Sequence, residues 1–416
     1  MNKPRAPMIS LDDAKAQLLA AVTALHQTEQ VSLMQAAGRV LAHSVTSRMD
    51  VPAFDNSAMD GYAVRCSDVA EGNVQLPVSQ RIAAGQSPQA LQQGTVARIF
   101  TGAPVPAGAD AVIMQEQATV SADGTAVSFD AVPKMGQSIR RRGEDIATGQ
   151  VVVAAGTRLH AAHVGLLASV GCDEVTVVRR PRVALCATGD ELVQPGSCSP
   201  EQLPAGAIFD SNRYFLTQLL RDAGCEVTDL GSIPDSLQAT QQVLSAAAQQ
   251  HDLVLTSGGV SVGEEDHVKP AVQSMGELAL WAIAIKPGKP FAYGHLRRPD
   301  DTRCHFIGLP GNPVSSLVTF LVLVRPFLQR LSGRTPSTDA PIEALASFDW
   351  LKPDNRREFL RASLTPEGVV GHPNQGSNVL TSVAASDVLI DNPPGQLIHK
   401  GDKVRCYPLR SWMLGN

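Results

Sequence analysis

The sequence is poor in aromatic residues, which make up 4% of its 416 positions, and it carries no excess of positive charge. Lysine and arginine together number 35 against 40 aspartates and glutamates, so the formal net charge is −5. Proteins that bind single-stranded nucleic acid stack its bases on aromatic side chains along a positively charged groove. Because both features are missing, neither a nucleic acid nor a membrane surface is expected as a partner.

The seven cysteines are scattered, odd in number and without a C-x-x-C pair, so they predict neither a disulfide framework nor a zinc site. The N-terminal residues lack the apolar core of a signal peptide. No apolar run approaches the roughly 18 residues that a membrane span needs. We therefore expect a cytoplasmic protein with reduced thiols. A length of 416 residues allows roughly two to four domains.

Helix and strand patterns alternate over residues 181–331, which predicts a doubly wound, mostly parallel α/β domain. Before it, short β segments and turns over residues 50–145 interrupt a helical and β region that occupies residues 1–49 and 146–180. This order predicts a β-rich domain inserted into a discontinuous N-terminal α+β domain. Short strands with glycine and proline turns over residues 332–416 predict a small C-terminal β-barrel. The expected fold is multidomain, α/β plus β.

A glycine-rich turn, T-S-G-G-V-S-V-G-E-E-D at residues 256–266, follows an apolar strand and leads into a predicted helix. Its glycines permit positive φ and a close approach of the backbone to a ligand. Free N–H groups at a helix start bind anions, assisted by the helix dipole. The three acids at the end of the turn suit a phosphate held together with a divalent cation. For this segment alone, a tight turn with acids at a helix start explains the pattern equally well.

A second anion-binding turn is predicted in G-L-P-G-N-P, where Asn312 can cap a helix and Pro313 can occupy its first position. Between the two turns lies A-I-K-P-G-K-P-F, in which a proline directly after Lys286 and another after Lys289 stiffen the backbone. Both lysines should therefore be better fixed than lysines of an ordinary loop. A solvated basic turn is the alternative explanation of this segment.

Ligands of parallel sheets bind beyond the carboxyl ends of the strands, so these turns should meet the acids that follow other strands. Those acids are Asp190, Glu191, Asp235 and Asp266. Phosphate anchors beside carboxylates indicate Mg²⁺-assisted chemistry at a phosphate ester or anhydride. The residues by themselves thus predict a phosphate-handling enzyme that acts on a small molecule, and they do not name the substrate.

Six motifs, taken in order, resemble the MoeA family of molybdopterin molybdenumtransferases, which is related to the E domain of gephyrin. They are D-N-S-A-M-D-G-Y-A, T-G-A-P-V-P, R-R-R-G-E-D, S-G-G-V-S-V-G, A-I-K-P-G-K-P and G-L-P-G-N-P. The resemblance runs from about Ser10 to the C-terminal barrel and implies a MogA-like α/β domain. It also implies an elongated homodimer, with an active cleft between the α/β domain of one subunit and the inserted β-rich domain of the other. The implied reaction converts adenylylated molybdopterin and molybdate into molybdenum cofactor and AMP.

The resemblance also carries the functional positions of the family onto this sequence. The catalytic positions fall on Asp60, Thr101, Asp145, Glu191, Asp235, Asp266, Lys286 and Lys289, and further site positions on Pro310 and Pro313. The phosphate groups of the substrate are expected on the two turns, at Ser257, Gly258, Gly259, Ser261, Gly263, Pro310, Gly311, Asn312 and Pro313.

The remaining roles follow from charge. Lys286 and Lys289 would contact molybdate or phosphoryl oxygens, because lysine suits a point-charge contact with an oxyanion. Mg²⁺ would be held by Glu191, Asp235 and Asp266. Asp60, Thr101 and the loop from Arg140 to Asp145 would close the site from the partner subunit. For the arginines of this loop, a solvated charge run is the alternative.

The sequence departs from the family at one position. Many members carry a lysine directly after the tryptophan that precedes A-I-K, whereas here Trp281 is followed by Ala282. Either an arginine elsewhere supplies the third positive charge or molybdate is bound more weakly.

Two rival functions are weighed: adenylylation of molybdopterin, and a gephyrin-like dimeric scaffold. The N-terminal domains and R-R-R-G-E-D argue against the first, and the lack of a long disordered linker argues against the second. A molybdopterin adenylyltransferase and proteins that handle the finished cofactor are the expected protein partners.

Overall fold

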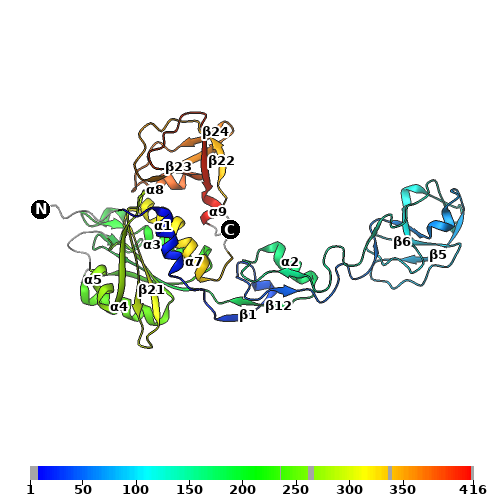
Figure 1. The fold of residues 1–416 in the computed structure, drawn as a ribbon, viewed down its shortest axis with the longest axis horizontal. Coiled ribbons are helices and arrows are strands. Elements are labelled where there is room, and N and C mark those ends of the chain that lie inside the picture. Colours follow the sequence, from blue (N-terminus) through cyan, green and yellow to red (C-terminus); the bar gives the residue numbers. More distant parts are fainter. Residues whose placement is uncertain (1–7, 235, 261–266, 336–339, 414–416) are drawn as a thin grey trace.

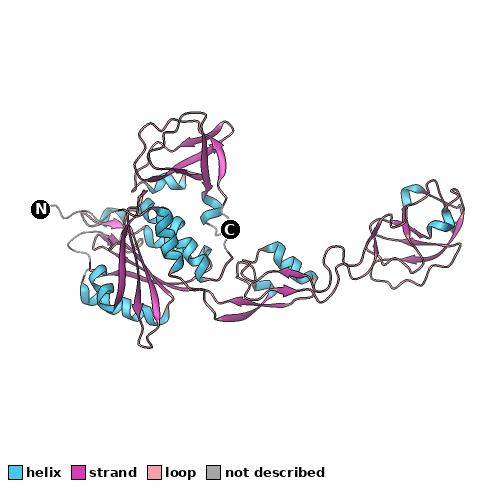
Figure 2. Ribbon diagram, in the orientation of Figure 1, coloured by secondary structure: helices cyan, strands magenta, loops and turns pink. Residues whose placement is uncertain are grey.

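The chain forms a long molecule whose computed structural model describes residues 8–234, 236–260, 267–335 and 340–413. An α/β domain and the C-terminal β domain lie together at one end, and the β-rich domain lies at the other (Figure 1). A small domain, made from two separate stretches of chain, connects the two ends. Helices cluster in the α/β domain, while strands and loops dominate elsewhere (Figure 2). The expected multidomain fold, α/β plus β, is confirmed.

The β-rich end is built on a sheet with the strand order β7-β4-β6-β5-β9-β8. Its strands are β4 (Gly61–Val64), β5 (Leu76–Ile82), β6 (Val96–Ile99), β7 (Ala111–Met114), β8 (Ala118–Val120) and β9 (Ala126–Phe129). Because successive side chains of a strand point to opposite faces, Tyr62 and Val64 join one apolar core while Ala63 joins another. The short strands β3 (Asn56–Ser57) and β10 (Ile139–Arg140) pair the beginning of this domain with its end.

The chain passes through the small connecting domain twice. β1 (Thr28–Ser32) pairs with β12 (Glu174–Val178), and β2 (Val45–Thr46) pairs with β11 (Val151–Val153). The 3₁₀ turn η1 (Leu33–Gln35) and helix α2 (Ala161–Ser169) complete it around a small apolar core. The two ends of the inserted stretch meet here, because the Ser47 amide donates to the Gln150 carbonyl over 2.9 Å.

The α/β domain contains a twisted sheet in the order β16-β13-β17-β21-β20-β18. Its strands are β13 (Arg182–Thr188), β16 (Glu226–Ile233), β17 (Leu253–Ser257), β18 (Gly276–Ala282), β20 (Pro290–Arg297) and β21 (Arg303–Leu309). The pairs from β16 to β21 are parallel, and β20 pairs in antiparallel fashion with both of its neighbours. The buried strands β13 and β17 read as continuous apolar runs because helices cover both faces of the sheet.

Helices α4 (Leu237–Gln250) and α5 (Val268–Met275) contribute to the core on one face of this sheet. The other face is covered by α3 (Asn212–Asp222), by a long helix and by α1 (Leu11–Ala20). The long helix consists of α6 (Pro313–Thr319), a π-helical stretch (Phe320–Val324) and α7 (Arg325–Leu331). Residues Pro313–Leu331 are long and apolar enough to cross a membrane by length and composition alone, but 83% of that stretch is buried. It is therefore the core helix of this domain.

Helix α1 begins at Ser10, whose hydroxyl oxygen accepts a hydrogen bond from the Asp13 amide. Leu11, Ala14 and Leu18 recur at spacings of three and four residues and are buried. They join the core formed by α6 and α7. The N-terminal helix thus belongs by its packing to the α/β domain, although β1 and β2 that follow it belong to the small connecting domain.

The C-terminal domain contains β22 (Ile342–Leu345), β23 (Arg357–Thr365), β24 (Gly368–Gly371), β25 (Val388–Asn392) and β26 (Lys403–Pro408), with the short helices α8 (Leu380–Ala384) and α9 (Leu409–Met413). The strand order is β19-β23-β25-β26-β22, and β24 pairs with β23. A further bridge joins Ala346, just after β22, to Val369 of β24, so the strands close around a small apolar core. The edge strand β19 (Ile285–Lys286) comes from the α/β half of the chain.

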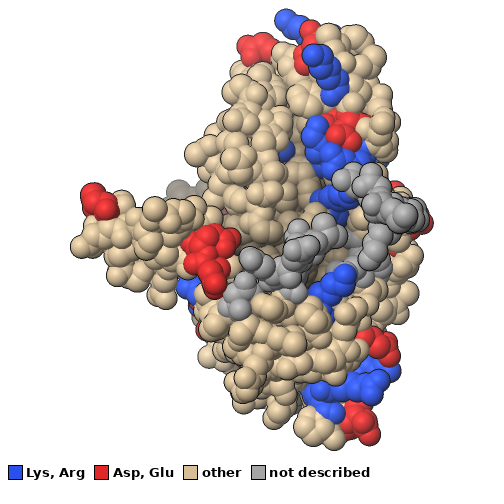
Figure 3. All heavy atoms as spheres, turned by 90° about the vertical axis from the view of Figure 1, so that its left-hand side faces the viewer, with Lys and Arg blue, Asp and Glu red and all other residues tan. Residues whose placement is uncertain are grey.

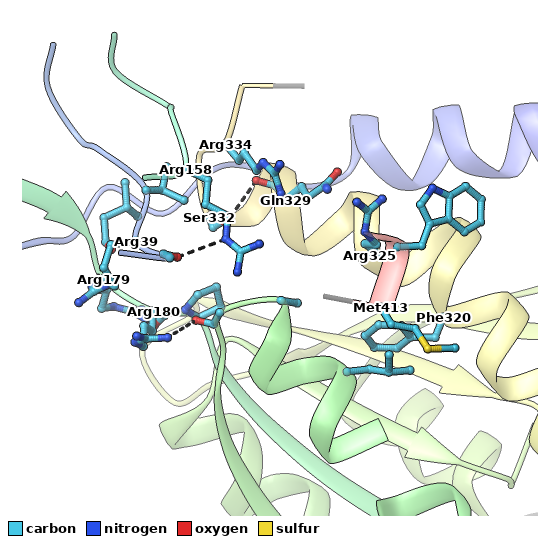
Figure 4. Close-up of a pocket in the computed structure, with 18 residues that line it drawn as sticks. Arg39, Arg158, Arg179, Arg180, Phe320, Arg325, Gln329, Ser332, Arg334 and Met413 are labelled. Carbon is cyan, nitrogen blue, oxygen red and sulfur yellow. Dashed lines mark hydrogen bonds between the residues drawn. The ribbon is translucent and has the colours of Figure 1, made fainter. Parts of the chain in front are cut away.

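An arginine-lined cavity of about 30 Å³ lies where the connecting domain, the α/β domain and helix α9 meet (Figure 4). Arg39 pairs with Glu29, and Arg179 binds both carboxylate oxygens of Asp252 at 2.7 Å. Burial raises the pKa of Asp252, but hydrogen bonds from Arg179 and the Arg182 amide outweigh it, and the pKa is lowered. The cavity has room for about two water molecules. We interpret it as a junction that joins the domains.

A partly buried polar cluster lies on β20 and β21. The Tyr293 hydroxyl lies 3.0 Å from His295 Nε2 and 3.0 Å from His305 Nδ1, and the His305 ring contacts Phe327 of α7 edge-on. Burial disfavours the charged ring and lowers the pKa of His305 from 6.5 to about 4. His305 is therefore neutral in the folded protein near pH 7.

We predict that acid destabilises the α/β domain through His305. Below about pH 6.5 the unfolded chain takes up a proton at this ring that the folded chain accepts only near pH 4, so stability falls across this window by roughly 3 kcal/mol. Denaturant titrations at pH 7, 5.5 and 4.5 measure the free energy of unfolding. His305→Gln should flatten its pH dependence, and the exposed control His26→Gln should not. An unchanged pH dependence in His305→Gln would refute the assignment.

Candidate functional site

The predicted ligand-binding turns meet at the carboxyl ends of β13, β17 and β21. In this register Ser257 pairs with Ala187 on one side and with Leu309 on the other. Asn212 at the start of α3 ties the two turns together, because its Nδ2 donates to Ser257 Oγ over 2.9 Å and to the Gly311 carbonyl over 2.7 Å. Figure 3 shows this end of the molecule, where lysine and arginine side chains line the border between the upper C-terminal domain and the lower α/β domain.

The first turn requires its glycines. Gly258 and Gly259 have φ of +91° and +67°. A Cβ at Gly258 would lie 2.8 Å from the Thr188 carbonyl oxygen, and one at Gly259 would lie 2.5 Å from Val268 Cγ2. The backbone of β17 therefore turns tightly between β13 and α5. Ser261 and Gly263, predicted to bind the substrate, lie outside the described residues.

The second turn begins the long helix as predicted, with Asn312 as N-cap and Pro313 at the first helical position. Among the described residues, the Asn312 side chain makes no capping hydrogen bond. The C-terminal domain supplies one instead, since the Val314 amide donates to the Ser377 carbonyl over 2.9 Å. One N–H group that we expected to face an anion is thus occupied by protein. Pro310 is buried behind the turn, and Gly311 is exposed.

The loop that carries Lys286 and Lys289, here called the lysine loop, lies between these turns and touches two domains. Lys286 pairs with Glu358 of β23 through β19, and its Nζ lies 3.2 Å from Glu358 Oε1 and 3.5 Å from Asp354 Oδ2. On the other side, Gly288 has φ +111°, and a Cβ there would lie 2.5 Å from Thr319 Oγ1 of α6. The Lys289 carbonyl accepts from the Ile283 amide over 2.8 Å and closes the loop.

Sequence reasoning missed the two acids that face Lys286. They are 68 and 72 residues away along the chain, and nothing in D-N-R-R-E-F indicates their partner. Only the pairing of β19 with β23 brings them to the lysine. Asn212 was missed for the same reason. It is the first residue of α3 and lies far from both turns in the sequence.

Of the expected metal ligands, the structure describes Glu191 alone; Asp235 and Asp266 lie outside the described residues. Glu191 is exposed, and its carboxylate folds over Gly189, where a Cβ would lie 2.5 Å from Oε2. Within the described part of the chain, His, Cys, Asp and Glu form no group of three that would hold a metal ion. Thr188 pairs with Ile233, so the ends of β13 and β16, after which Glu191 and Asp235 come in the sequence, are adjacent.

A second group of predicted residues lies in the β-rich domain. Thr101 donates to Asp60 Oδ1 from its amide over 2.8 Å and from its hydroxyl over 2.7 Å, and these bonds lower the pKa of Asp60. Arg140 is exposed on β10, and Asp145 is exposed on the loop after it. The next two arginines of the loop are ion-paired, Arg141 with Asp55 and Arg142 with Asp50, both at 2.6 Å.

The two groups are at opposite ends of the molecule (Figure 1). The structure therefore brings Ser257, Gly258, Gly259, Pro310, Gly311, Asn312, Pro313, Lys286, Lys289 and Glu191 to one end. It brings Asp60, Thr101, Arg140 and Asp145 to the other. One chain by itself does not unite them.

Family models match most of the chain. The N-terminal region of MoeA, domains I and II, matches residues 9–171, and its C-terminal region, domain IV, matches residues 343–409. Between them, a probable molybdopterin binding domain matches residues 184–330. The chain belongs to the MoeA family.

Relatives of this MoeA-family chain can be aligned with it along almost its whole length. The molybdopterin molybdenumtransferase of Haemophilus influenzae is 41% identical over 389 residues, 92% of this chain and 94% of that protein. The protein of the same name from a Nostoc species is 38% identical, over 85% of this chain and 82% of its own. The crystal structure of the MoeA protein from Pyrococcus horikoshii has a TM-score of 0.84 at 28% identity, over 96% of this chain and 99% of that chain. These matches confirm the resemblance found in the sequence motifs.

We predict that Gly259→Ala costs more stability than positive φ alone explains. Strain at positive φ costs about 1–2 kcal/mol, and the contact with Val268 should raise the loss to roughly 2–4 kcal/mol. Gly196→Ala is the matched control, because Gly196 has φ +87° and its Cβ would meet no described atom within 4 Å. Denaturant unfolding measures both variants. Equal losses would show that the turn has room for a side chain.

Proposed function

We propose that the chain inserts molybdenum into molybdopterin during molybdenum cofactor biosynthesis, converting adenylylated molybdopterin and molybdate into molybdenum cofactor and AMP. The observation that carries this proposal is the pair of anion-binding turns, tied by Asn212 and adjoining a fixed lysine loop. The names of the relatives, molybdopterin molybdenumtransferase, support the same activity.

In this proposal the phosphate groups of the substrate bind at the two turns. Positive φ at Gly258 and Gly259 lets the backbone turn tightly at the end of β17, where the first phosphate subsite is proposed. Gly311 and Asn312 are exposed at the start of the long helix, where its dipole favours an anion. Asn212 keeps the two subsites at one spacing, which suits a phosphate at one and a pyrophosphate at the other.

Molybdate is expected beside the lysine loop. Lys286 is partly exposed and Lys289 follows it by three residues, so both can contact the oxygens of molybdate or of the leaving phosphoryl group. The molybdenum itself is then ligated by the dithiolene of the substrate, which explains why no cluster of histidines and cysteines is needed. Arg356 lies near, but its guanidinium is already bound to Asp354. Arg356 is therefore not a free replacement for the lysine expected at Ala282.

We propose Mg²⁺ as the cation held by Glu191, Asp235 and Asp266. Oxygen donors alone suit this ion, and the described Glu191 is exposed at a strand end beside the first turn. When bound, Mg²⁺ would polarise the phosphoanhydride and neutralise its developing charge.

A homodimer completes the proposed site. Asp60, Thr101, Arg140 and Asp145 lie too far from the turns of their own chain to act there (Figure 1). A second copy in the opposite direction would bring its β-rich domain against the α/β domain of the first, in a closed isologous pair. We expect this dimer in the cytoplasm; the seven cysteines, all described, form no disulfide. A molybdopterin adenylyltransferase would supply the substrate, and cofactor-handling proteins would receive the product.

Single-turnover conversion of adenylylated molybdopterin, with and without molybdate and Mg²⁺, tests the function. Release of AMP with formation of the molybdenum cofactor is the expected result, and both should require molybdate and Mg²⁺. Formation of adenylylated product from molybdopterin and ATP would instead identify an adenylyltransferase.

For the metal site, we predict that Asp266→Ala abolishes molybdenum insertion, because the cation loses a carboxylate ligand. The dimer should persist, as judged by its elution volume. Unchanged insertion activity in this variant would overturn the metal assignment.

For the shared site, we predict that two inactive variants complement one another. Asp60→Ala damages the β-rich group, and Lys286→Ala damages the lysine loop. If the site spans two subunits, refolding an equal mixture restores about a quarter of wild-type activity, because half of the dimers then carry one intact site. Either variant refolded alone is the control. No recovery in the mixture would overturn the proposal that the site is shared between two subunits.

A further inference from the structure

Glu358 is a buried acid of the C-terminal domain that lies under the lysine loop. Its side chain is 0% exposed. One oxygen, Oε2, accepts hydrogen bonds from Trp350 Nε1 over 2.8 Å and from Asn392 Nδ2 over 3.4 Å. The other, Oε1, accepts no hydrogen bond from any described residue and lies 3.2 Å from Lys286 Nζ. A buried carboxylate oxygen without a hydrogen bond is costly, so the charge of Lys286 compensates for it.

The backbone around Lys286 is held by the same domain. The Arg357 amide donates to the Ala284 carbonyl over 3.0 Å, and Lys286 stands opposite Glu358 in the parallel pairing of β19 with β23. Both the main chain and the ammonium group of Lys286 are thus fixed by β23. The lysine side chain is still 39% exposed, so its ammonium group has an open side toward a ligand.

We propose that Glu358 is a positioning residue, which holds the Lys286 ammonium group where the oxyanion of the substrate binds. The inference rests on the proposed function of Lys286 as an oxyanion contact. A lysine on a flexible stem loses rotational freedom when it binds a ligand. A lysine already fixed by an ion pair has less freedom to lose, so it binds the oxyanion more tightly. The C-terminal domain is in this way a working part of the active site.

Asp354 is the weaker partner of the same lysine. Its Oδ2 lies 3.5 Å from Lys286 Nζ, and its side chain is 24% exposed. Both of its carboxylate oxygens already accept hydrogen bonds from Arg356 over 2.8 Å. Its negative charge is therefore shared with an arginine and exposed to water, whereas that of Glu358 faces Lys286 from within the protein.

The test is a double-mutant cycle on the full-length protein. Glu358→Gln keeps the shape of the side chain and an oxygen for Trp350, and it removes the charge. We expect the KM and the calorimetric Kd for molybdate to rise roughly tenfold while kcat changes less than about twofold. In a Lys286→Gln background, the cycle is completed by calorimetry, and the same substitution should change the Kd for molybdate by less than about twofold, because its effect acts through the lysine.

Two variants make the cycle decisive. Glu343→Gln breaks another acid–lysine pair of the same domain, with Lys403 at 3.3 Å, and should leave Kd and KM as in the wild type. If Glu358→Gln fails to fold, Trp350→Phe keeps an aromatic ring, removes the hydrogen bond to Oε2 together with part of the indole, and should raise Kd and KM roughly threefold with kcat retained.

The proposal would be overturned if Glu358→Gln raised the Kd equally with and without Lys286, or if it did not raise the Kd at all. An inactive wild type would refute the proposed function instead, and the molybdate titrations would still decide the role of Glu358.

Discussion

The functional end of this molecule depends on one short strand that changes sheets. Strands β18 and β20 belong to the α/β sheet, yet the segment between them adds β19 to the edge of the C-terminal sheet. Each residue offers one backbone N–H and one C=O for pairing. Because β19 pairs with the C-terminal sheet, its backbone groups are not available to the α/β sheet. The lysine loop is consequently fixed by two domains, on α6 through Gly288 and on β23 through Lys286. The geometry of the lysine loop is therefore set by the interface between the α/β domain and the C-terminal domain.

The two ligand turns obey a similar constraint. Each follows a buried parallel strand, and neighbouring strands place them side by side. Their spacing is set by Asn212, a buried side chain whose amide donates to both turns. Because the Ser377 carbonyl also accepts from an amide of the long helix, three separate regions of the chain hold the two turns in place. Contacts between residues that are far apart in the sequence thus hold the two turns in position.

The elements of this fold were largely predictable because their signals are local. Alternating helix and strand patterns predicted the α/β domain with its strand β17, and the glycines and prolines of S-G-G and G-N-P predicted turns that the structure contains. The neighbours of Lys286 were not predictable, since Glu358 and Asp354 come to it through the pairing of β19 with β23. Likewise, the amide of Val314 appeared free in the sequence, and only the folded C-terminal domain supplies its acceptor. Asp60 and Thr101 were connected by family resemblance, because 41 residues separate them.

The hydrogen bond between Ser47 and Gln150 makes the stretch between them a separate module of the molecule. Their main chains are hydrogen-bonded where the chain leaves for the β-rich domain and where it returns. The hundred or so residues between them thus form a cassette whose two ends are adjacent, and insertion at such a place disturbs the host little. The host would keep its own cores if the cassette were exchanged for another. The β-rich domain can therefore change its sequence without rebuilding the α/β domain at the other end of the molecule.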